Sequence, residues 1–332
     1  MSDYPTAVFS TFAFIGFTIS LIPLPWHLEA WNSGTCYYMI WTSVGCLNQF
    51  INSVVWADDA INRAPVWCDI STRITLGVSV GIPASSLCIQ RRLYKIACMQ
   101  TVSISRAEKR RAILVDSLVS VLLPVIVMAL YYVVQGHRFD IFQEVGCYPV
   151  VYDTLPSYFL INMWPVLLGC ISAVYCILCI HVFLQRQVQF KEFLSASKGI
   201  TMGRYLRLMA LAMTEMLCTV PIGCYMIYLN ASAQNVRPWK GWADTHYDFS
   251  RVDQFPSVVW RMYHRSAVSI ELTRWLLPVC AIIFFAFFGF ASEARRHYAL
   301  VFWWVAKRFG FQRPASKPKA YAMFLPCFCL PC

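Results

Sequence analysis

The chain has 332 residues, of which 58% are hydrophobic and only 14% are charged, and its formal net charge is +11. A soluble domain is about 45–50% apolar and about 25% charged, so this composition excludes a soluble globular protein and indicates an integral membrane protein. In such a protein the loops that carry the positive charges determine the topology. The basic balance therefore does not imply a nucleic-acid partner, and none is expected.

Seven apolar segments are long enough to cross a bilayer, because a spanning helix needs about 20 mainly apolar residues. In chain order, we expect spans at residues 6–26, 37–56, 66–90, 113–134, 157–183, 205–229 and 262–291. No positive region precedes the first segment and no small-residue cleavage site follows it, so it is not read as a signal peptide. The prediction is an all-α bundle of seven transmembrane helices at residues 1–298, followed by a short tail at residues 299–332.

Positive charge predicts the orientation of this bundle. Nineteen of the 28 Lys and Arg residues lie in 91–111, in 186–207 or from residue 295 onward, and seven lie in the loops of the other side. Cytoplasmic loops carry the excess of Lys and Arg, so we expect the N-terminus outside and the C-terminus in the cytoplasm. The only long outer loop, 230–261, holds Trp239, Trp242, Tyr247 and Phe249. A loop of that length is functional or disordered.

Common catalytic and metal motifs are absent from the sequence. The six histidines are dispersed with no pair three or four residues apart, and there is no phosphate-binding loop, nucleophile elbow or paired-cysteine metal motif. We therefore expect neither an enzyme nor a bound cofactor or metal ion.

Five ionisable residues lie within the apolar spans, where charges are costly and normally face the bundle interior. Asp69 and Arg73 are four residues apart and can pair on one helix face, as can Glu271 and Arg274 at a spacing of three. Glu215 has no local partner. One interpretation is a structural Asp69–Arg73 pair near the outer interface. The other is that Arg73, Glu215, Glu271 and Arg274 form a polar floor under an outward-facing ligand pocket.

Two groups of cysteines stand apart from those in the apolar runs. Cys68 and Cys147 lie on the outer side, where oxidation is permitted, so they either form a disulfide that tethers the second outer loop or remain free thiols. Cys327, Cys329 and Cys332 follow a basic, aromatic stretch and are candidate palmitoylation sites.

Several motifs make the chain similar to a known family. These are "PLPWHLEAWN", "NQFINSVVWADD", "PVWCDISTRITLGVSVGIPASSLCIQRRLY", "GCYP" and "RWLLPVCAIIFFAFFGFASEARRHY". They resemble the fungal mating-pheromone receptors for lipid-modified, a-factor-type peptides, which are class D G-protein-coupled receptors, and the mushroom-type branch in particular. The resemblance implies a multi-pass receptor of the plasma membrane, with a prenylated peptide pheromone and a heterotrimeric G protein as its partners.

The sequence departs from the family pattern at two places. The family commonly has lysine where Arg73 stands, which keeps the charge but changes its geometry. Many members also have a longer cytoplasmic tail, so the short tail expected here puts normal desensitisation in question. The alternative class, a seven-helix transporter of a small solute, is disfavoured because neither half of the chain resembles the other.

Two basic clusters lie at the expected cytoplasmic ends of the third and sixth spans. They are Arg91, Arg92 and Lys95, and Arg204 and Arg207. Such clusters can simply hold the topology against an anionic leaflet. The resemblance offers a second role, in which both clusters dock the G protein once the sixth helix swings outward.

Overall fold

A computed structural model describes residues 4–98, 105–185, 202–233, 236–290 and 292–309. Residues 1–291 form one compact unit, and the chain from Ser292 onward forms a second, which is described by itself. The helical elements are, in chain order, α1 (Tyr4–Leu21), α2 (Leu24–Glu29), α3 (Ser33–Val55), α4 (Pro65–Cys98), α5 (Arg106–Ser117), η1 (Leu118–Leu122), α6 (Leu123–Val134), α7 (Leu155–Ser157), η2 (Tyr158–Asn162), α8 (Met163–Gln185), α10 (Met202–Ala233), α11 (Trp242–Thr245), α12 (Ser257–Met262), α13 (His264–Phe288) and α14 (Ser292–Arg308). The strands are β1 (Phe139–Phe142), β2 (Gly146–Tyr148) and β3 (Val252–Phe255).

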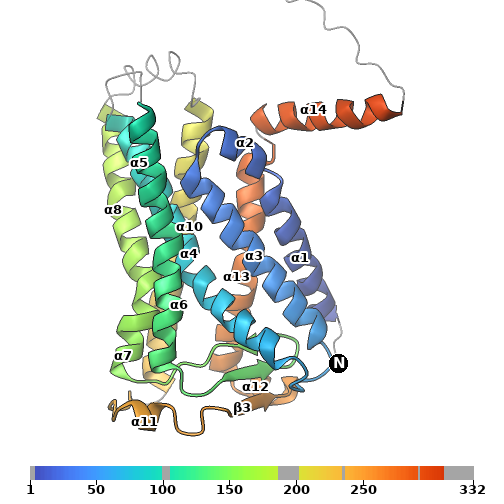
Figure 1. The fold of residues 1–332 in the computed structure, drawn as a ribbon, viewed down its shortest axis with the longest axis vertical. Coiled ribbons are helices and arrows are strands. Elements are labelled where there is room, and N and C mark those ends of the chain that lie inside the picture. Colours follow the sequence, from blue (N-terminus) through green and yellow to red (C-terminus); the bar gives the residue numbers. More distant parts are fainter. Residues whose placement is uncertain (1–3, 99–104, 186–201, 234–235, 291, 310–332) are drawn as a thin grey trace, which may run out of the picture. The chain divides into compact units, whose positions relative to one another are not determined.

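The long helices of the first unit run side by side as a bundle (Figure 1). Within the described residues, six helical segments are long and apolar enough to cross a membrane, namely Thr6–Glu29, Pro65–Cys98, Arg106–Val134, Leu155–Gln185, Tyr205–Ser232 and His264–Phe288. The chain is therefore a helical membrane protein. We call the end of the bundle that carries the three strands the sheet end, and the end that carries the last turn of α4 the opposite end.

Helix α3 is not among the six apolar segments, although its 23 residues give it a length of about 35 Å. Two of its asparagine side chains bond to α4 inside the bundle. Asn52 donates to the Ser71 hydroxyl at 2.8 Å, and Asn48 donates to the Thr75 hydroxyl at 3.2 Å. These two amides therefore bond to a neighbouring helix and fix α3 against α4.

Close packing of α3 on α4 depends on a glycine. A Cβ atom on Gly81 would lie 2.5 Å from the Trp41 ring, so only a residue without a side chain fits there. The Trp41 indole N–H then reaches the Ser120 carbonyl at 2.7 Å. One aromatic side chain thus joins three consecutive long segments of the chain.

Two long segments contain a short π-helical stretch immediately before a proline. The stretch η1 precedes Pro124, and η2 precedes Pro165. Proline cannot donate to the helical ladder and clashes with the preceding turn. A widened turn relieves that conflict, and neighbouring helices tolerate the bend inside a bundle.

A three-stranded sheet closes the sheet end, and the all-α expectation missed it (Figure 1). Strand β1 pairs antiparallel with β2, with Ile141 opposite Cys147, and parallel with β3, with Phe139 opposite Val252. The strands have only three or four residues, too few for the alternating pattern that marks a strand in sequence. The sheet joins the loop that follows α6 to the loop that follows α10.

Candidate functional site

A disulfide fixes the sheet to the bundle. Cys68 in the first turn of α4 is bonded to Cys147 in β2, and their Cα atoms are 5.2 Å apart. Both cysteines are buried among Trp56, Phe139 and Ile141. Of the two alternatives that the sequence left open, the structure therefore contains the bridge.

Asp69 does not pair with Arg73, so that expectation was wrong. Instead, the Arg138 guanidinium donates to both carboxylate oxygens of Asp69, at 3.0 and 2.6 Å. This hydrogen bonding raises the pKa of Arg138. A pair at a spacing of four along one helix stabilises by only about 0.2–0.5 kcal/mol, whereas a bidentate contact from another segment is both stronger and more directional. The pair ties α4 to the residue that precedes β1.

Arg73 points into the bundle toward α6. Its guanidinium donates to the Gln135 side chain at 2.9 Å and lies 4.6 Å from the centre of the Tyr131 ring. Its second terminal nitrogen is buried and has no hydrogen-bond partner. Since a buried donor without a partner is costly, Arg73 has an unused hydrogen-bonding capacity at the sheet end.

A chain of four alternating charges links the sheet to α13. Glu144, in the turn between β1 and β2, accepts from Arg261 of α12 at 2.5 Å. Arg261 also lies 3.4 Å from Glu271, which lies 3.5 Å from Arg274. The expected Glu271–Arg274 pair is thus present, as the inner part of a larger network.

Arg274 is the most buried member of that network. Its side chain is 4% exposed, and its guanidinium lies 3.9 Å from the centre of the Phe9 ring in α1. Two of its nitrogens are buried without a hydrogen-bond partner. Arg274 therefore resembles Arg73 in carrying spare donors inside the bundle.

The predicted polar floor is divided between two networks in the part of the chain that is described. Arg73 bonds to the α6 side, whereas Glu271 bonds to α12 and Arg274 contacts α1; among the described residues, no hydrogen bond or ion pair joins the two groups. Glu215 lies on α10, but its side chain is outside the described set. Gln135, which accepts from Arg73, donates to the Arg138 carbonyl at 2.6 Å just before β1, and Glu144 accepts from Arg261 just after it, so each network contacts one end of β1.

The strands carry a third polar group, formed by His137, Asp140, Arg251 and Asp253. The His137 Nε2 atom lies 2.7 Å from Asp140 and 3.6 Å from Asp253, and its Nδ1 atom lies 3.1 Å from Arg251. Arginine can only donate, so Nδ1 is the acceptor and Nε2 carries the proton. Burial raises the pKa of Asp140 despite the hydrogen bond from His137. The arginine supplies the positive charge for these carboxylates and holds β1 against β3.

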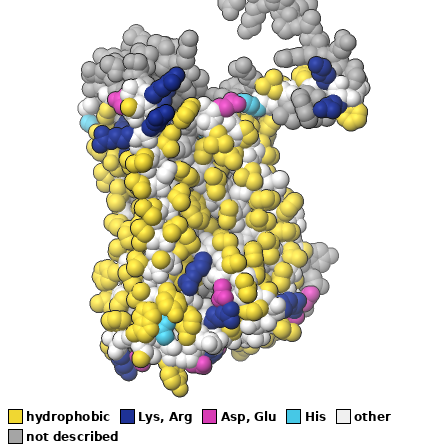
Figure 2. Space-filling model, in the orientation of Figure 1, with side chains coloured by type: hydrophobic (Ala, Val, Ile, Leu, Met, Phe, Trp, Pro, Cys, Tyr) yellow, Lys and Arg dark blue, Asp and Glu magenta, His cyan; other side chains and the backbone are white. Residues whose placement is uncertain are grey.

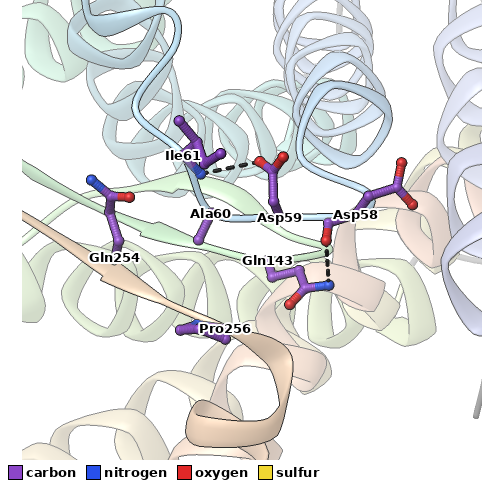
Figure 3. Close-up of a pocket in the computed structure, with 7 residues that line it drawn as sticks. All are labelled: Asp58, Asp59, Ala60, Ile61, Gln143, Gln254 and Pro256. Carbon is purple, nitrogen blue, oxygen red and sulfur yellow. Dashed lines mark hydrogen bonds between the residues drawn. The ribbon is translucent and has the colours of Figure 1, made fainter.

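A shallow pocket of about 490 Å³ opens on the outer surface of the sheet (Figure 3). It lies between the loop after α3 and the ends of β1 and β3, where Gln143 donates to the Asp58 carbonyl at 2.9 Å and Asp59 accepts from the Ile61 amide at 3.1 Å. Its lining residues are Asp58, Asp59, Ala60, Ile61, Gln143, Gln254 and Pro256. Asp58, Asp59, Gln143 and Gln254 place carboxylate and amide groups among apolar residues on this surface, so it offers hydrogen-bonding groups to a peptide backbone.

The third-span basic cluster is partly occupied by structural contacts at the opposite end. Arg91 donates to Asp116 at 2.7 Å, and Asp116 also accepts from Ser33. Arg92 contacts the Trp31 carbonyl, whereas Lys95 is exposed. Arg91 thus joins α4 to α5, and Lys95 is the cluster member most accessible to a partner.

The last turns of α4 pack against the first turns of α10 beside this cluster. Leu93 and Ile96 of α4 share one buried core with Tyr205 and Leu208 of α10. The Tyr205 hydroxyl lies 2.7 Å from the Cys179 sulfur of α8. Arg207 is half-buried, and the Arg204 side chain is outside the described set. Apolar side chains thus fill the contact between this end of α4 and the start of α10.

Helix α14 exposes Phe302, at 63%, and carries Lys307 and Arg308 in its last turn. The candidate palmitoylation sites Cys327, Cys329 and Cys332 lie outside the described residues.

Sequence reasoning missed the partners that complete these networks. The sequence predicts no site role for Glu144, Asp116 or Gln135, and Arg138 and Arg261 contribute there only to the charge of the outer loops. Asp116 gave a usable signal, because it is an acidic residue at the start of a long apolar run. The loop charges gave none, since their partners are distant in sequence.

The ion pair between Arg261 and Glu144 can be tested by substitution. The Glu144 side chain is only 11% exposed, so we expect Arg261→Gln to leave a poorly solvated carboxylate and to lower the stability of the purified protein by about 1–2 kcal/mol. Arg63→Gln is the matched control, because the Arg63–Asp59 pair is exposed and should change stability by less than about 0.5 kcal/mol. Thermal unfolding in detergent measures both. Equal effects would show that Arg261 is an ordinary surface residue.

These features define a membrane helix bundle whose sheet end is tied to α4 and α13. Residues 8–310 match the profile of the pheromone A receptor (STE3) family, and the chain belongs to that family. It is 55% identical over 319 residues to the pheromone B alpha 3 receptor of Schizophyllum commune, which covers 96% of this chain and 51% of that protein. It is 32% identical to pheromone receptor 1 of Mycosarcoma maydis, across 94% of this chain and 87% of that protein.

A more distant relative is the pheromone a factor receptor of Saccharomyces cerevisiae, which is 24% identical over 83% of this chain and 57% of its own length. The chain spans about half the length of the Schizophyllum receptors that it matches.

Proposed function

We propose that the protein is a G-protein-coupled receptor of the plasma membrane that binds a prenylated peptide pheromone and activates a heterotrimeric G protein. Its relatives are named as pheromone receptors. In this proposal α3 is the seventh span beside the six apolar ones, the sheet end faces outside, and the opposite end faces the cytoplasm. The charge asymmetry of the loops favours that orientation.

One observation carries the proposal: the sheet is bound to two different long helices by separate contacts. The disulfide and the Asp69–Arg138 pair hold α4, and the Glu144–Arg261–Glu271 chain holds α13. A ligand that binds against the sheet therefore acts on both helices at once. Binding favours whichever arrangement of these helices has the higher ligand affinity.

The two parts of the proposed ligand suit different surfaces. The peptide backbone finds hydrogen-bonding groups in the pocket of Asp58, Gln143 and Gln254. Carbonyl groups of the peptide that reach further into the bundle would accept from the unpaired nitrogens of Arg73 and Arg274. The prenyl chain partitions into the bilayer or between apolar helices, because each buried CH₂ contributes about 0.8 kcal/mol.

In the same proposal, the opposite end of the bundle binds the G protein. In the arrangement described above, apolar packing between α4 and α10 closes the space beside Lys95. We infer that activation moves the inner part of α10 away from α4 and exposes an apolar floor bordered by the two basic clusters. Such a cleft suits an amphipathic helix of a partner protein.

The lipid requirement is the first test of the proposed ligand class. We expect a prenylated peptide to be at least tenfold more potent than the same peptide without its lipid, because the prenyl group adds several kcal/mol of membrane partitioning and pocket contact. A panel of synthetic peptides, each made with and without the prenyl group, is applied to cells that express this chain and a pathway reporter. Equal potency of the two forms would overturn the assignment to a lipopeptide ligand.

A further inference from the structure

An exposed aromatic cluster lies where α6 ends at the sheet end. Tyr132 of α6 lies 5.6 Å from Trp242, 5.2 Å from His246 and 5.4 Å from Phe249, measured between ring centres. Trp242 stacks on His246 at 4.0 Å. We call residues 239–249 the aromatic loop, and Tyr132 is the residue of α6 on which it packs.

The aromatic loop is held in place by polar contacts rather than by burial. His246 lies 2.9 Å from the Tyr132 carbonyl, Tyr152 donates to Asp244 at 3.2 Å, and the Trp239 indole N–H donates to Thr245 at 3.1 Å. Its large side chains remain exposed: 52% for Trp242 and 82% for Tyr247. The loop therefore presents ordered aromatic side chains to its surroundings.

These side chains continue a surface that already faces lipid. Along η1 and α6, Leu122, Val125, Ile126 and Tyr132 are between 43% and 47% exposed, as expected for the lipid-facing side of a spanning helix. Hydrophobic side chains cover the side of the bundle down to the sheet end (Figure 2). The aromatic loop thus lies at the level where the apolar side of α6 gives way to polar groups.

The composition of the loop matches the headgroup region of a bilayer. Tryptophan and tyrosine are enriched there because they combine an apolar ring with one polar group. Arg237 precedes the loop and Lys240 is its second residue, and cationic side chains are attracted to anionic headgroups. Facing water, the same cluster would be a large exposed apolar patch, which monomeric proteins rarely carry outside interaction sites.

We propose that the aromatic loop inserts into the boundary between headgroups and acyl chains of the leaflet at the sheet end. This is the outer leaflet in the proposed orientation. The contact requires no ligand, so it stands whether or not the proposed pheromone is correct. It would hold the loop that carries β3 at a fixed depth, next to the position from which a membrane-borne ligand arrives.

Lipid-borne and aqueous quenchers distinguish a membrane-inserted loop from a water-facing one. The protein is placed in nanodiscs that contain lipids brominated near the headgroup, and tryptophan emission is compared with that of the unchanged chain. Tyr247→Trp adds a reporter to the aromatic loop, and Asp58→Trp adds a matched reporter to the exposed pocket of the sheet. We expect brominated lipid to quench the emission added at position 247 at least twofold more than that added at 58, with iodide showing the reverse order.

Removing a native tryptophan from the loop gives a second, independent measurement. Trp242→Phe keeps an aromatic ring against His246, and the emission that it removes should be emission that brominated lipid quenches, so the lipid-quenched fraction should fall. If the added emission at 247 responds to iodide and not to brominated lipid, or if positions 247 and 58 respond alike, the loop faces water and the proposal is wrong. If Trp242→Phe leaves the lipid-quenched fraction unchanged, the proposal is also wrong.

Discussion

Replacing Cys68 or Cys147 with serine is expected to remove most ligand binding and surface expression, and both variants should be affected to the same degree. The bridge closes a loop of 79 residues, for which chain entropy alone gives a stabilisation of about 4 kcal/mol. That is a large share of the total stability of a typical domain. Surface immunostaining and binding of labelled pheromone on the same cells provide the measurement.

The double variant and an unrelated cysteine make this test specific. Cys68→Ser combined with Cys147→Ser should be no worse than either single change, because all three variants lack the same bond. Cys98→Ser, at the exposed far end of α4, should behave as the unchanged chain. If one single variant is silent and the other severe, the two cysteines do not act as a pair.

Replacing both Arg204 and Arg207 with glutamine is expected to abolish signalling while leaving surface level and pheromone affinity nearly unchanged. These residues lie in the first turns of α10, at the proposed cytoplasmic edge of the cleft that opens on activation. Reporter output divided by surface receptor number is the quantity to measure. The alternative, that the arginines only fix the topology, gives less protein at the surface but normal signalling per receptor.

Arg110→Gln combined with Arg111→Gln is the matched control for that experiment. It removes the same number of charges on the same proposed side, from exposed positions in α5. A general loss of positive charge would reduce the signal in both double variants. A loss confined to the Arg204 and Arg207 pair would place the coupling surface at α10.

The helices of the bundle could be predicted because a bilayer imposes a length and a polarity on each span. That rule identified the spans that contain α4, α6, α8, α10 and α13, but it ended the third span at residue 90, whereas α4 runs to Cys98. It failed for the sheet, whose longest strands have four residues and whose partners β1 and β3 are separated by more than a hundred residues. Pairing of that kind depends on how the helix ends are placed in space, which local patterns do not encode.

The candidate site shows the same division between local and distant contacts. Glu271 and Arg274 were predicted as a pair because their spacing places them on one helix face. The same argument gave the wrong partner for Asp69, since Arg138 arrives from another segment with two hydrogen bonds. Spacing shows which residues can meet along a helix, but not whether a residue from elsewhere competes for the same charge.

The central proposal is that a prenylated peptide at the sheet end changes the opposite end in a way that a G protein reads. The most direct test uses the purified chain in nanodiscs together with a heterotrimeric G protein and follows guanine-nucleotide exchange. Prenylated pheromone should accelerate exchange by at least tenfold, and Arg204→Gln with Arg207→Gln should abolish the acceleration without weakening pheromone binding. Saturating pheromone binding with no change in exchange rate would contradict the account.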